Sequence, residues 1–153
     1  MAYIVLNVRG TIDVSEQVRR TLRMLRIPLR YRATILPESD SVRGMLQKAR
    51  HRIAWCKADK ELVKELIEKR GMKEGWKKLE KSDLKRLGYS GFDELAEAIA
   101  EDEVDFGKLD GIKPFFALSP PRGGFKRTVK RFYEQGGVLG ENPELPELIR
   151  RML

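Results

Sequence analysis

The sequence has little of the residues that build disulfides, metal sites and catalytic centres, since its 153 residues include one cysteine and one histidine. The single cysteine, Cys56, excludes an internal disulfide framework and is typical of a reducing cytosol. His51 has no cluster of cysteines or carboxylates around it in the sequence, so we predict no metal site. Because one isolated histidine does not supply a general acid–base set, we predict no catalytic residues and no enzymatic activity.

Long apolar runs and nucleotide-binding motifs are missing as well. No apolar stretch approaches the ~18 residues that are needed to cross a bilayer, and the N-terminus lacks a signal-peptide pattern. The glycines around position 123 do not form a P-loop pattern, and the dinucleotide-binding pattern GxGxxG is absent. We therefore expect a soluble, cytoplasmic protein with no membrane partner, no cofactor and no small-molecule substrate.

Charged residues, in contrast, are abundant and unevenly placed, with Lys+Arg 31, Asp+Glu 23 and a net charge of +8. Residues 1–58 carry 12 cations and 4 acids, residues 59–112 carry 11 and 15, and residues 113–153 carry 8 and 4. Ten of the first twelve cations are arginine, the residue best suited to bidentate phosphate contacts. Two basic ends around an acidic middle predict a polyanionic partner.

The first part of the chain predicts a small core of alternating strands and helices. Apolar residues at strand and helix spacing indicate, in order, residues 3–9 (strand), 16–26 (helix), 31–36 (strand), 42–50 (helix) and 53–57 (strand). Ser15 and Ser41 are the expected helix caps, and Trp55 is the expected core anchor. This order predicts a two-layer sandwich with both helices on one face of the sheet, whose other face must be covered or used.

The rest of the chain predicts a mainly helical extension. We expect helices over residues 60–70, 92–101 and 142–153, a short turn capped by Ser82, a loop over 73–81 and a strand over 113–119 that joins the first sheet. The fold class is therefore α+β. We divide the chain into a core (residues 1–58), an acidic helical extension (59–112) and a segment with the returning strand, a basic arm and the C-terminal helix (113–153).

Arginines recur on the first predicted helix at a spacing that places them on one face. Arg19, Arg23 and Arg26 stand at positions i, i+4 and i+7, and Arg20 lies beside them. Like charges at this spacing destabilise a helix by ~0.2–0.5 kcal/mol per pair, which favours an anionic partner over plain solvation. We predict that these four side chains contact RNA phosphates.

The second predicted helix adds Arg43 and Lys48 to the predicted phosphate contacts. Gly44 in the same helix is unfavourable by ~0.5–1 kcal/mol relative to alanine. We expect that a close approach by RNA or by another backbone requires this glycine.

Residues 120–140, here called the basic arm, combine turn residues, cations and aromatic rings. Gly123 and Gly124, which follow a Pro-Pro pair, free the backbone to turn and to approach a partner closely. The arm carries five cations: Arg122, Lys126, Arg127, Lys130 and Arg131. We predict an extended RNA-binding arm, and the alternative is a solvated glycine-rich loop with ordinary surface charge. Phe125 and Tyr133 either stack on unpaired bases or fold back on the core.

Short motifs, in one shared order along the chain, resemble a known family. In the first part these are NVRG (7–10), VRRTL (18–22), ILPE (35–38) and GMLQK (44–48). Further along they are GIKP (111–114), PRGGFK (121–126), QGG (135–137) and LIRRM (148–152). Each motif alone is weakly specific, but their order along nearly the whole chain resembles the large-subunit ribosomal protein L-thirty family, in the long form of archaea and eukaryotes.

The resemblance implies a β-α-β-α-β core with an antiparallel sheet in strand order 3-1-2, related to the ferredoxin-like fold. It also implies a non-enzymatic, structural role in the large ribosomal subunit. The partners that it implies are the large-subunit rRNA, a nearby 5S rRNA and neighbouring ribosomal proteins. The cations of the two helices and of the basic arm are then the expected rRNA contacts.

The chain departs from the family pattern at three positions. Archaeal relatives often have arginine and histidine where this chain has Ala117 and Ser119, so we carry over no RNA contact there. A glycine commonly follows the tryptophan at the position of Cys56, which leaves the end of the third strand open.

Two other functions compete with a ribosomal role. Sandwiches of the ferredoxin-like kind often bind metabolites between subunits, so a small-molecule regulatory module is the main alternative. It predicts a saturable ligand and a dimer, and it gives no reason for the arginine row or the basic arm. An RNA-modifying or nucleolytic enzyme would need an acid–base set that the sequence lacks.

Overall fold

The three strands of the predicted core form the centre of a larger sheet. A computed structural model describes all of residues 1–153. Along the chain the elements are β1 (Tyr3–Asn7), α1 (Glu16–Met24), β2 (Arg32–Leu36), α2 (Asp40–Lys48), β3 (Ile53–Lys57), α3 (Lys60–Arg70), β4 (Met72–Lys73), β5 (Lys77–Lys78), α4 (Lys81–Arg86), α5 (Phe92–Ala100), the 3-10 turn η1 (Phe106–Lys108), β6 (Phe116–Ala117), β7 (Thr128–Phe132), the 3-10 turn η2 (Tyr133–Gln135), β8 (Gly137–Glu141) and α6 (Leu145–Met152).

The large sheet has six strands in the order β6-β2-β1-β3-β8-β7. β1 lies at its centre and pairs antiparallel with both β2 and β3, with Leu6 opposite Ala33 and Ala54. The predicted antiparallel order 3-1-2 is confirmed, and so is the returning strand, because β6 pairs antiparallel with β2. β8 and β7, which the sequence analysis did not predict, extend the other side of the sheet in parallel.

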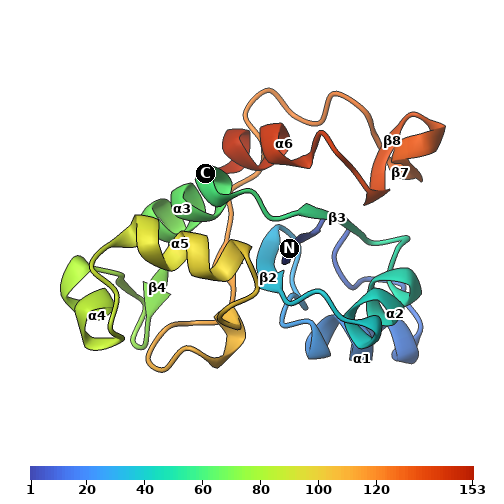
Figure 1. Ribbon diagram of the computed structural model, residues 1–153. Coiled ribbons are helices and arrows are strands. Elements are labelled where there is room, and N and C mark those ends of the chain that lie inside the picture. Colours follow the sequence, from blue (N-terminus) through green and yellow to red (C-terminus); the bar gives the residue numbers. More distant parts are fainter.

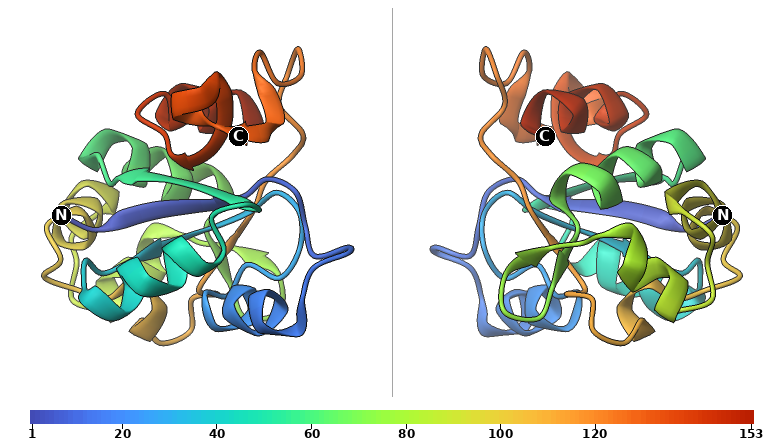
Figure 2. Two further views of the ribbon diagram at one scale, coloured as in Figure 1. Left: turned by 90° about the vertical axis from the view of Figure 1, so that its right-hand side faces the viewer. Right: turned by 90° about the vertical axis from the view of Figure 1, so that its left-hand side faces the viewer.

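Helices cover both faces of this sheet, so the fold has three layers (Figures 1 and 2). α1 and α2 lie on one face, as predicted for the core. α3 and α5 of the extension, together with the C-terminal helix α6, lie on the other face, and their apolar residues join one buried cluster with the core strands. The α+β fold class is confirmed, and the extension supplies the cover that the second sheet face needed. None of the helices is long and apolar enough to span a membrane.

Alternation along β1 sends its side chains into two separate buried clusters. Ile4 and Leu6 face the extension, while Tyr3 and Val5 face α1 and α2. All five residues of β1 are buried, because a strand covered on both faces has no solvated side. Trp55 of β3 packs in the cluster under α1 and α2 with 6% of its surface exposed, which confirms its predicted role as a core anchor.

The start of α1 agrees with the prediction and its end does not. The Ser15 hydroxyl accepts a hydrogen bond from the Val18 amide at 3.3 Å, so Ser15 caps the helix as predicted. The helix ends at Met24, two residues early, and Arg26 follows it with a left-handed backbone at φ +66°. Arg26 therefore does not continue the helical arginine row.

The cap of α2 is Ser39 and not the predicted Ser41. The Ser39 hydroxyl accepts a hydrogen bond from the Val42 amide at 3.2 Å, and the helix begins at Asp40. Either serine suits a cap, but the earlier one places the negative charge of Asp40 in the first turn, next to the positive end of the helix dipole.

The part of the chain after β3 also differs from its prediction in detail. Part of the predicted loop over 73–81 folds into the hairpin β4–β5. α4 begins after Glu80 rather than after Ser82, and the Asp83 carboxylate accepts a hydrogen bond from the Glu80 amide at 3.0 Å. α6 begins at Leu145, because the side chain of Asn142 closes a separate turn by accepting a hydrogen bond from the amide two residues on, at 2.8 Å.

Candidate nucleic-acid interface

Four arginines meet at the end of the sheet where β1 ends and where β2 and β3 begin. We call this set, Arg9, Arg30, Arg50 and Arg52, the basic sheet end. Because β1 runs antiparallel to both neighbours, residues that follow β1 lie beside residues that precede β2 and β3. Figure 2 shows the loop after β1 projecting at this end, opposite the N-terminus.

Carbonyl groups, rather than acids, accept hydrogen bonds from three of the four arginines of the basic sheet end. Arg9 donates to the carbonyl of His51 at 3.4 Å, Arg30 to that of Val8 at 3.2 Å and Arg52 to that of Asp13 at 3.2 Å. None of the four arginines forms an ion pair within 4.0 Å. Partial burial and the neighbouring positive charge of Arg9 lower the pKa of the Arg52 guanidinium. The nearby charge of Asp13 opposes this shift but forms no ion pair, so the site keeps a net positive charge that suits phosphate groups.

Aromatic rings attach the basic arm to this end of the sheet. The Phe132 ring lies 5.0 Å from the His51 ring, and the Arg50 guanidinium lies 5.0 Å from the same phenyl centroid. The Phe125 ring lies 6.2 Å from Tyr31 and packs against the buried core. Of the two fates predicted for Phe125, folding back on the core is the one observed.

The predicted contact residues of α1 divide into three groups. Arg19 and Arg23 both pair with Glu16, at 3.8 and 2.8 Å, and stay about half exposed. Arg20 is exposed and forms no ion pair. Arg26 leaves this face, since its guanidinium packs against Gly107 of η1, where an added Cβ would lie 1.5 Å from Nη1. We retain the first three as candidate contacts of the helix face and correct the position of Arg26.

The cations of the basic arm also differ from one another in their partners. Lys126 pairs with Glu147 at 3.7 Å, and Arg127 pairs with Glu144 at 3.3 Å, so α6 partly neutralises both. Three further cations of the arm are exposed and form no ion pair: Arg122, Lys130 and Arg131. Gly123 and Gly124 have φ of +77° and +73°, so the arm turns there, and the Arg151 guanidinium holds the turn by donating to the carbonyls of Arg122 and Gly124 at 3.0 and 2.7 Å.

Residues 3–53 match the family model described as ribosomal protein L30p/L7e. Proteins named large ribosomal subunit protein uL30 are similar over 99% of this chain and 98% of their own length, with 47% identity in Cenarchaeum symbiosum and 45% in Nitrosopumilus maritimus. The chain belongs to the ribosomal protein L30p/L7e family. Membership supports a structural role in the large ribosomal subunit and favours that role over a small-molecule regulatory module.

Within this L30p/L7e chain, the positions that depart from the family pattern have structural roles. The Ala117 carbonyl and the Ser119 hydroxyl both accept hydrogen bonds from Arg70, at 3.3 and 2.9 Å. Cys56 lies inside β3, which continues to Lys57, so the strand does not end at the departing residue. Burial raises the pKa of the Cys56 thiol to about 12, and no group of three or more His, Cys, Asp or Glu is placed to hold a metal ion.

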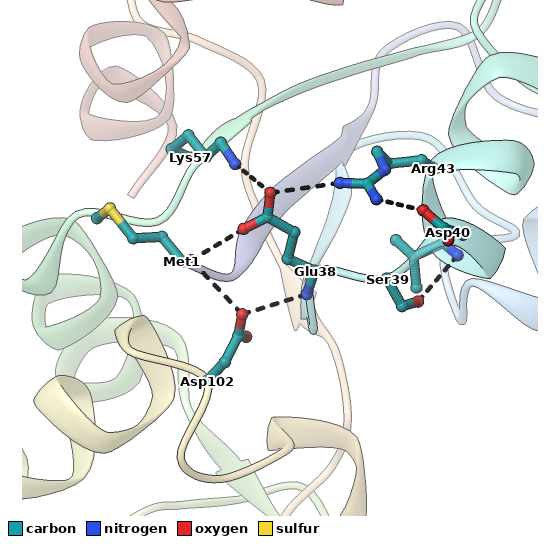
Figure 3. Close-up of polar contacts among 8 residues, drawn as sticks. Met1, Glu38, Ser39, Asp40, Arg43, Lys57 and Asp102 are labelled. Atoms are coloured by element: carbon teal, nitrogen blue, oxygen red, sulfur yellow. Dashed lines mark hydrogen bonds and ion pairs between the residues drawn. The ribbon is translucent and has the colours of Figure 1, made fainter.

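Arg43 lies apart from the basic sheet end, in a network of ion pairs around the carboxylates of Glu38 and Asp40, here called the acidic network (Figure 3). It pairs with Asp40 and, at 3.4 Å, with Glu38, whose carboxylate also accepts hydrogen bonds from Lys57 at 2.7 Å and from the amino group of Met1 at 3.0 Å. α2 begins beside the acidic network and ends near the basic sheet end. Lys48, the last residue of α2, is therefore the α2 cation nearest the basic sheet end, and it is exposed and forms no ion pair.

The ionised Glu38 carboxylate should stabilise the folded protein at neutral pH, and this contribution should be lost in acid. Hydrogen bonds from Lys57 and from the Met1 amino group lower the pKa of Glu38 from 4.5 to about 2. A lowered carboxyl pKa stabilises the folded state above pH ~4.5, and this contribution is lost as pH falls towards ~2. We therefore expect Glu38→Gln to unfold at lower urea concentration than the wild type at pH 7, with the gap closing in strong acid. Glu101→Gln, at an exposed acid without an ion pair, controls for charge, and a gap that does not change with pH contradicts this account.

Gly44 of α2 can be tested for the predicted close approach. A Cβ added at this exposed helical position meets nothing within 4 Å in the free protein. We expect Gly44→Ala to raise the free energy of unfolding by about 0.5–1 kcal/mol, measured by urea denaturation. If RNA approaches here, the same variant binds rRNA fragments more weakly although it is more stable. Unchanged affinity removes Gly44 from the interface.

The sequence analysis missed the four arginines of the basic sheet end as a group. They lie in loops and are separated by up to 43 positions, from Arg9 to Arg52, so no helical or strand periodicity connects them. A signal was available, because each arginine stands within three positions of a predicted strand end. Antiparallel pairing of the three strands would then have placed the arginines together.

Proposed function

We propose that this chain is a structural, non-catalytic constituent of the large ribosomal subunit that binds large-subunit rRNA. The contact surface that we propose joins the basic sheet end, the exposed face of α1, the end of α2 and the basic arm. The observation that carries the proposal is the gathering of cations without acid partners at one end of the sheet, in a chain of a ribosomal protein family.

In this proposal the elements have different tasks. Arg20 and Lys48, together with the basic sheet end, form a rigid platform that neutralises phosphates. The arm extends the contact through Arg122, Lys130 and Arg131, and its glycines allow RNA close to the backbone. Four other predicted contacts have protein partners here: Arg19, Arg23, Lys126 and Arg127. On binding, each of these side chains exchanges a carboxylate partner for a phosphate, so each contributes less to the free energy of RNA binding than an unpaired cation does.

Arg26 and Arg43 have lesser parts in the proposed contact. Arg26 packs on η1, and Arg43 is paired within the acidic network, so each would need to break its present contacts to reach RNA. We propose that the core (1–58), the acidic extension (59–112) and the segment with the arm (113–153) differ in function. They are not independently folding domains in this proposal, because one buried cluster includes residues of all three.

We further propose that the protein lies near 5S rRNA and beside other ribosomal proteins, in cytoplasmic ribosomes. The direct test is co-sedimentation of the tagged chain with large subunits after a high-salt wash. We expect retention on the subunit and, with a photo-crosslinker at position 130, crosslinks to large-subunit rRNA. Crosslinks to 5S rRNA would support the proposal that the protein lies near it. Complete release of the chain from the large subunit at low salt would contradict the structural role.

A further inference from the structure

A second basic surface lies on the β4–β5 hairpin, next to the basic sheet end, because Arg32 at the start of β2 contacts the Phe115 ring that lies beside Trp76. In Figure 1 this hairpin lies beside α4. Residues 59–112 are acidic overall, yet the second strand of the hairpin is Lys77-Lys78, and both lysines are exposed and form no ion pair. The hairpin is thus a cationic projection from an acidic segment.

The turn of the hairpin presents a tryptophan to solvent. Trp76 is 56% exposed, whereas the other tryptophan, Trp55, is 6% exposed. Gly75 and Trp76 both have left-handed backbone, with φ of +82° and +61°. Such a backbone is uncommon for a bulky residue and is strained, so the folded chain tolerates a local penalty to display an indole ring in water.

The exposed ring is part of a series of alternating cations and aromatic rings. Lys113 Nζ lies 4.2 Å from the Trp76 ring centroid, and the Phe115 ring lies 6.0 Å from Trp76 in an edge arrangement. The guanidinium of Arg32 lies 4.2 Å from the Phe115 ring. These contacts bring three separate segments together, and each ring has a cation beside it.

The hairpin is fixed to the body of the protein. The Lys113 amide donates to the Met72 carbonyl at 2.8 Å, and the Glu74 amide donates to the Gly111 carbonyl at 3.2 Å. Trp76 is therefore held on a braced two-stranded element, so little conformational freedom remains to be lost when a partner binds the ring.

We propose that Trp76 stacks on an unpaired RNA base, with Lys77, Lys78 and Lys113 contacting the adjoining phosphates. An exposed aromatic face with cations around it is the arrangement that binds single-stranded nucleic acid, whereas bases inside a duplex are not available to stack. Phe125 and Phe132 of the basic arm, in contrast, are turned onto the protein. This inference rests on the proposed RNA-binding function but concerns a neighbouring surface and a different mode of contact.

Tryptophan fluorescence tests the proposal, because Trp55 is buried and Trp76 is not. A 12-nucleotide single-stranded RNA should quench the emission of the full-length protein more than a duplex of the same sequence. Trp76→Leu should abolish this extra quenching and lower the affinity for labelled single-stranded RNA about tenfold, measured by anisotropy. Trp76→Phe keeps an aromatic face and should bind close to the wild type, and circular dichroism melting checks that both variants are folded.

The outcomes separate this surface from the basic sheet end. Equal single-strand affinity of the wild type and Trp76→Leu, with steep salt dependence retained, overturns the stacking proposal and leaves the proposed function intact. If the wild-type protein binds no RNA even at low salt, both the stacking proposal and the proposed function are overturned. Quenching of Trp76 by other large-subunit proteins but not by RNA also overturns the proposal, because the hairpin is then a protein contact.

Discussion

Replacing Arg20, Lys48 and Arg131 together by alanine should weaken binding to large-subunit rRNA fragments roughly a hundredfold at 0.1 M salt. These residues come from α1, α2 and the basic arm, and all three are exposed and form no ion pair. Each phosphate contact that is lost should reduce the slope of log K against log salt by ~0.7–0.9, so the slope of the triple variant should be shallower by about two units.

A matched variant separates this surface from net charge. Lys69, Lys85 and Lys108 are also exposed and form no ion pair, but they lie in the extension, so their triple replacement removes the same charge elsewhere. We expect the control to keep nearly the wild-type slope in a filter-binding salt series. Equal losses in the two variants would show that only the overall charge matters, and the proposed surface would then be wrong.

Phe116→Ala should lower the free energy of unfolding by about 3–5 kcal/mol, the largest stability effect that we expect from one substitution. The Phe116 side chain is fully buried in β6 and stacks on Phe106, with ring centroids 4.9 Å apart. It packs in the cluster that joins the extension to the central strands. The loss is large against a typical total of ~5–15 kcal/mol for a domain.

The unfolding experiment should use two probes. Because the buried cluster includes residues of both the core and the extension, we expect Trp55 fluorescence and far-UV circular dichroism to report one coincident transition in urea. Ile12→Ala, at a side chain that is 79% exposed, should change stability by less than ~0.5 kcal/mol. A loss below ~1 kcal/mol for Phe116→Ala, or two separate transitions, would show that the extension is an independent unit.

Local patterns carried much of the prediction for the core. The alternation along residues 3–9, with Ile4 and Leu6 on one face, and the cap at Ser15 each involve residues only a few positions apart, so short-range sterics and hydrogen bonds decide them. The errors concentrate where two local choices are nearly equal in energy. Ser39 and Ser41 are both suitable caps, and only packing of the whole helix selects between them.

The candidate interface was less accessible to the same reasoning. The row on α1 follows from helical spacing, but the ion pairs of Arg19 and Arg23 with Glu16 depend on side-chain conformations that spacing does not specify. The pairs between the basic arm and α6 and the packing of Phe132 on His51 link residues that lie far apart in the chain. No sequence periodicity predicts such contacts.

Composition, charge distribution and ordered motifs thus determined the class of this protein, because those properties survive in the sequence without reference to distance. They indicated a basic α+β chain of a ribosomal protein family with cations on α1 and in the arm. The tertiary structure decided which cations keep their charge available. Antiparallel pairing places Arg9 beside Arg52, while the early end of α1 turns Arg26 onto η1. The electrostatic field depends on distances between charges, and only the folded chain sets those distances.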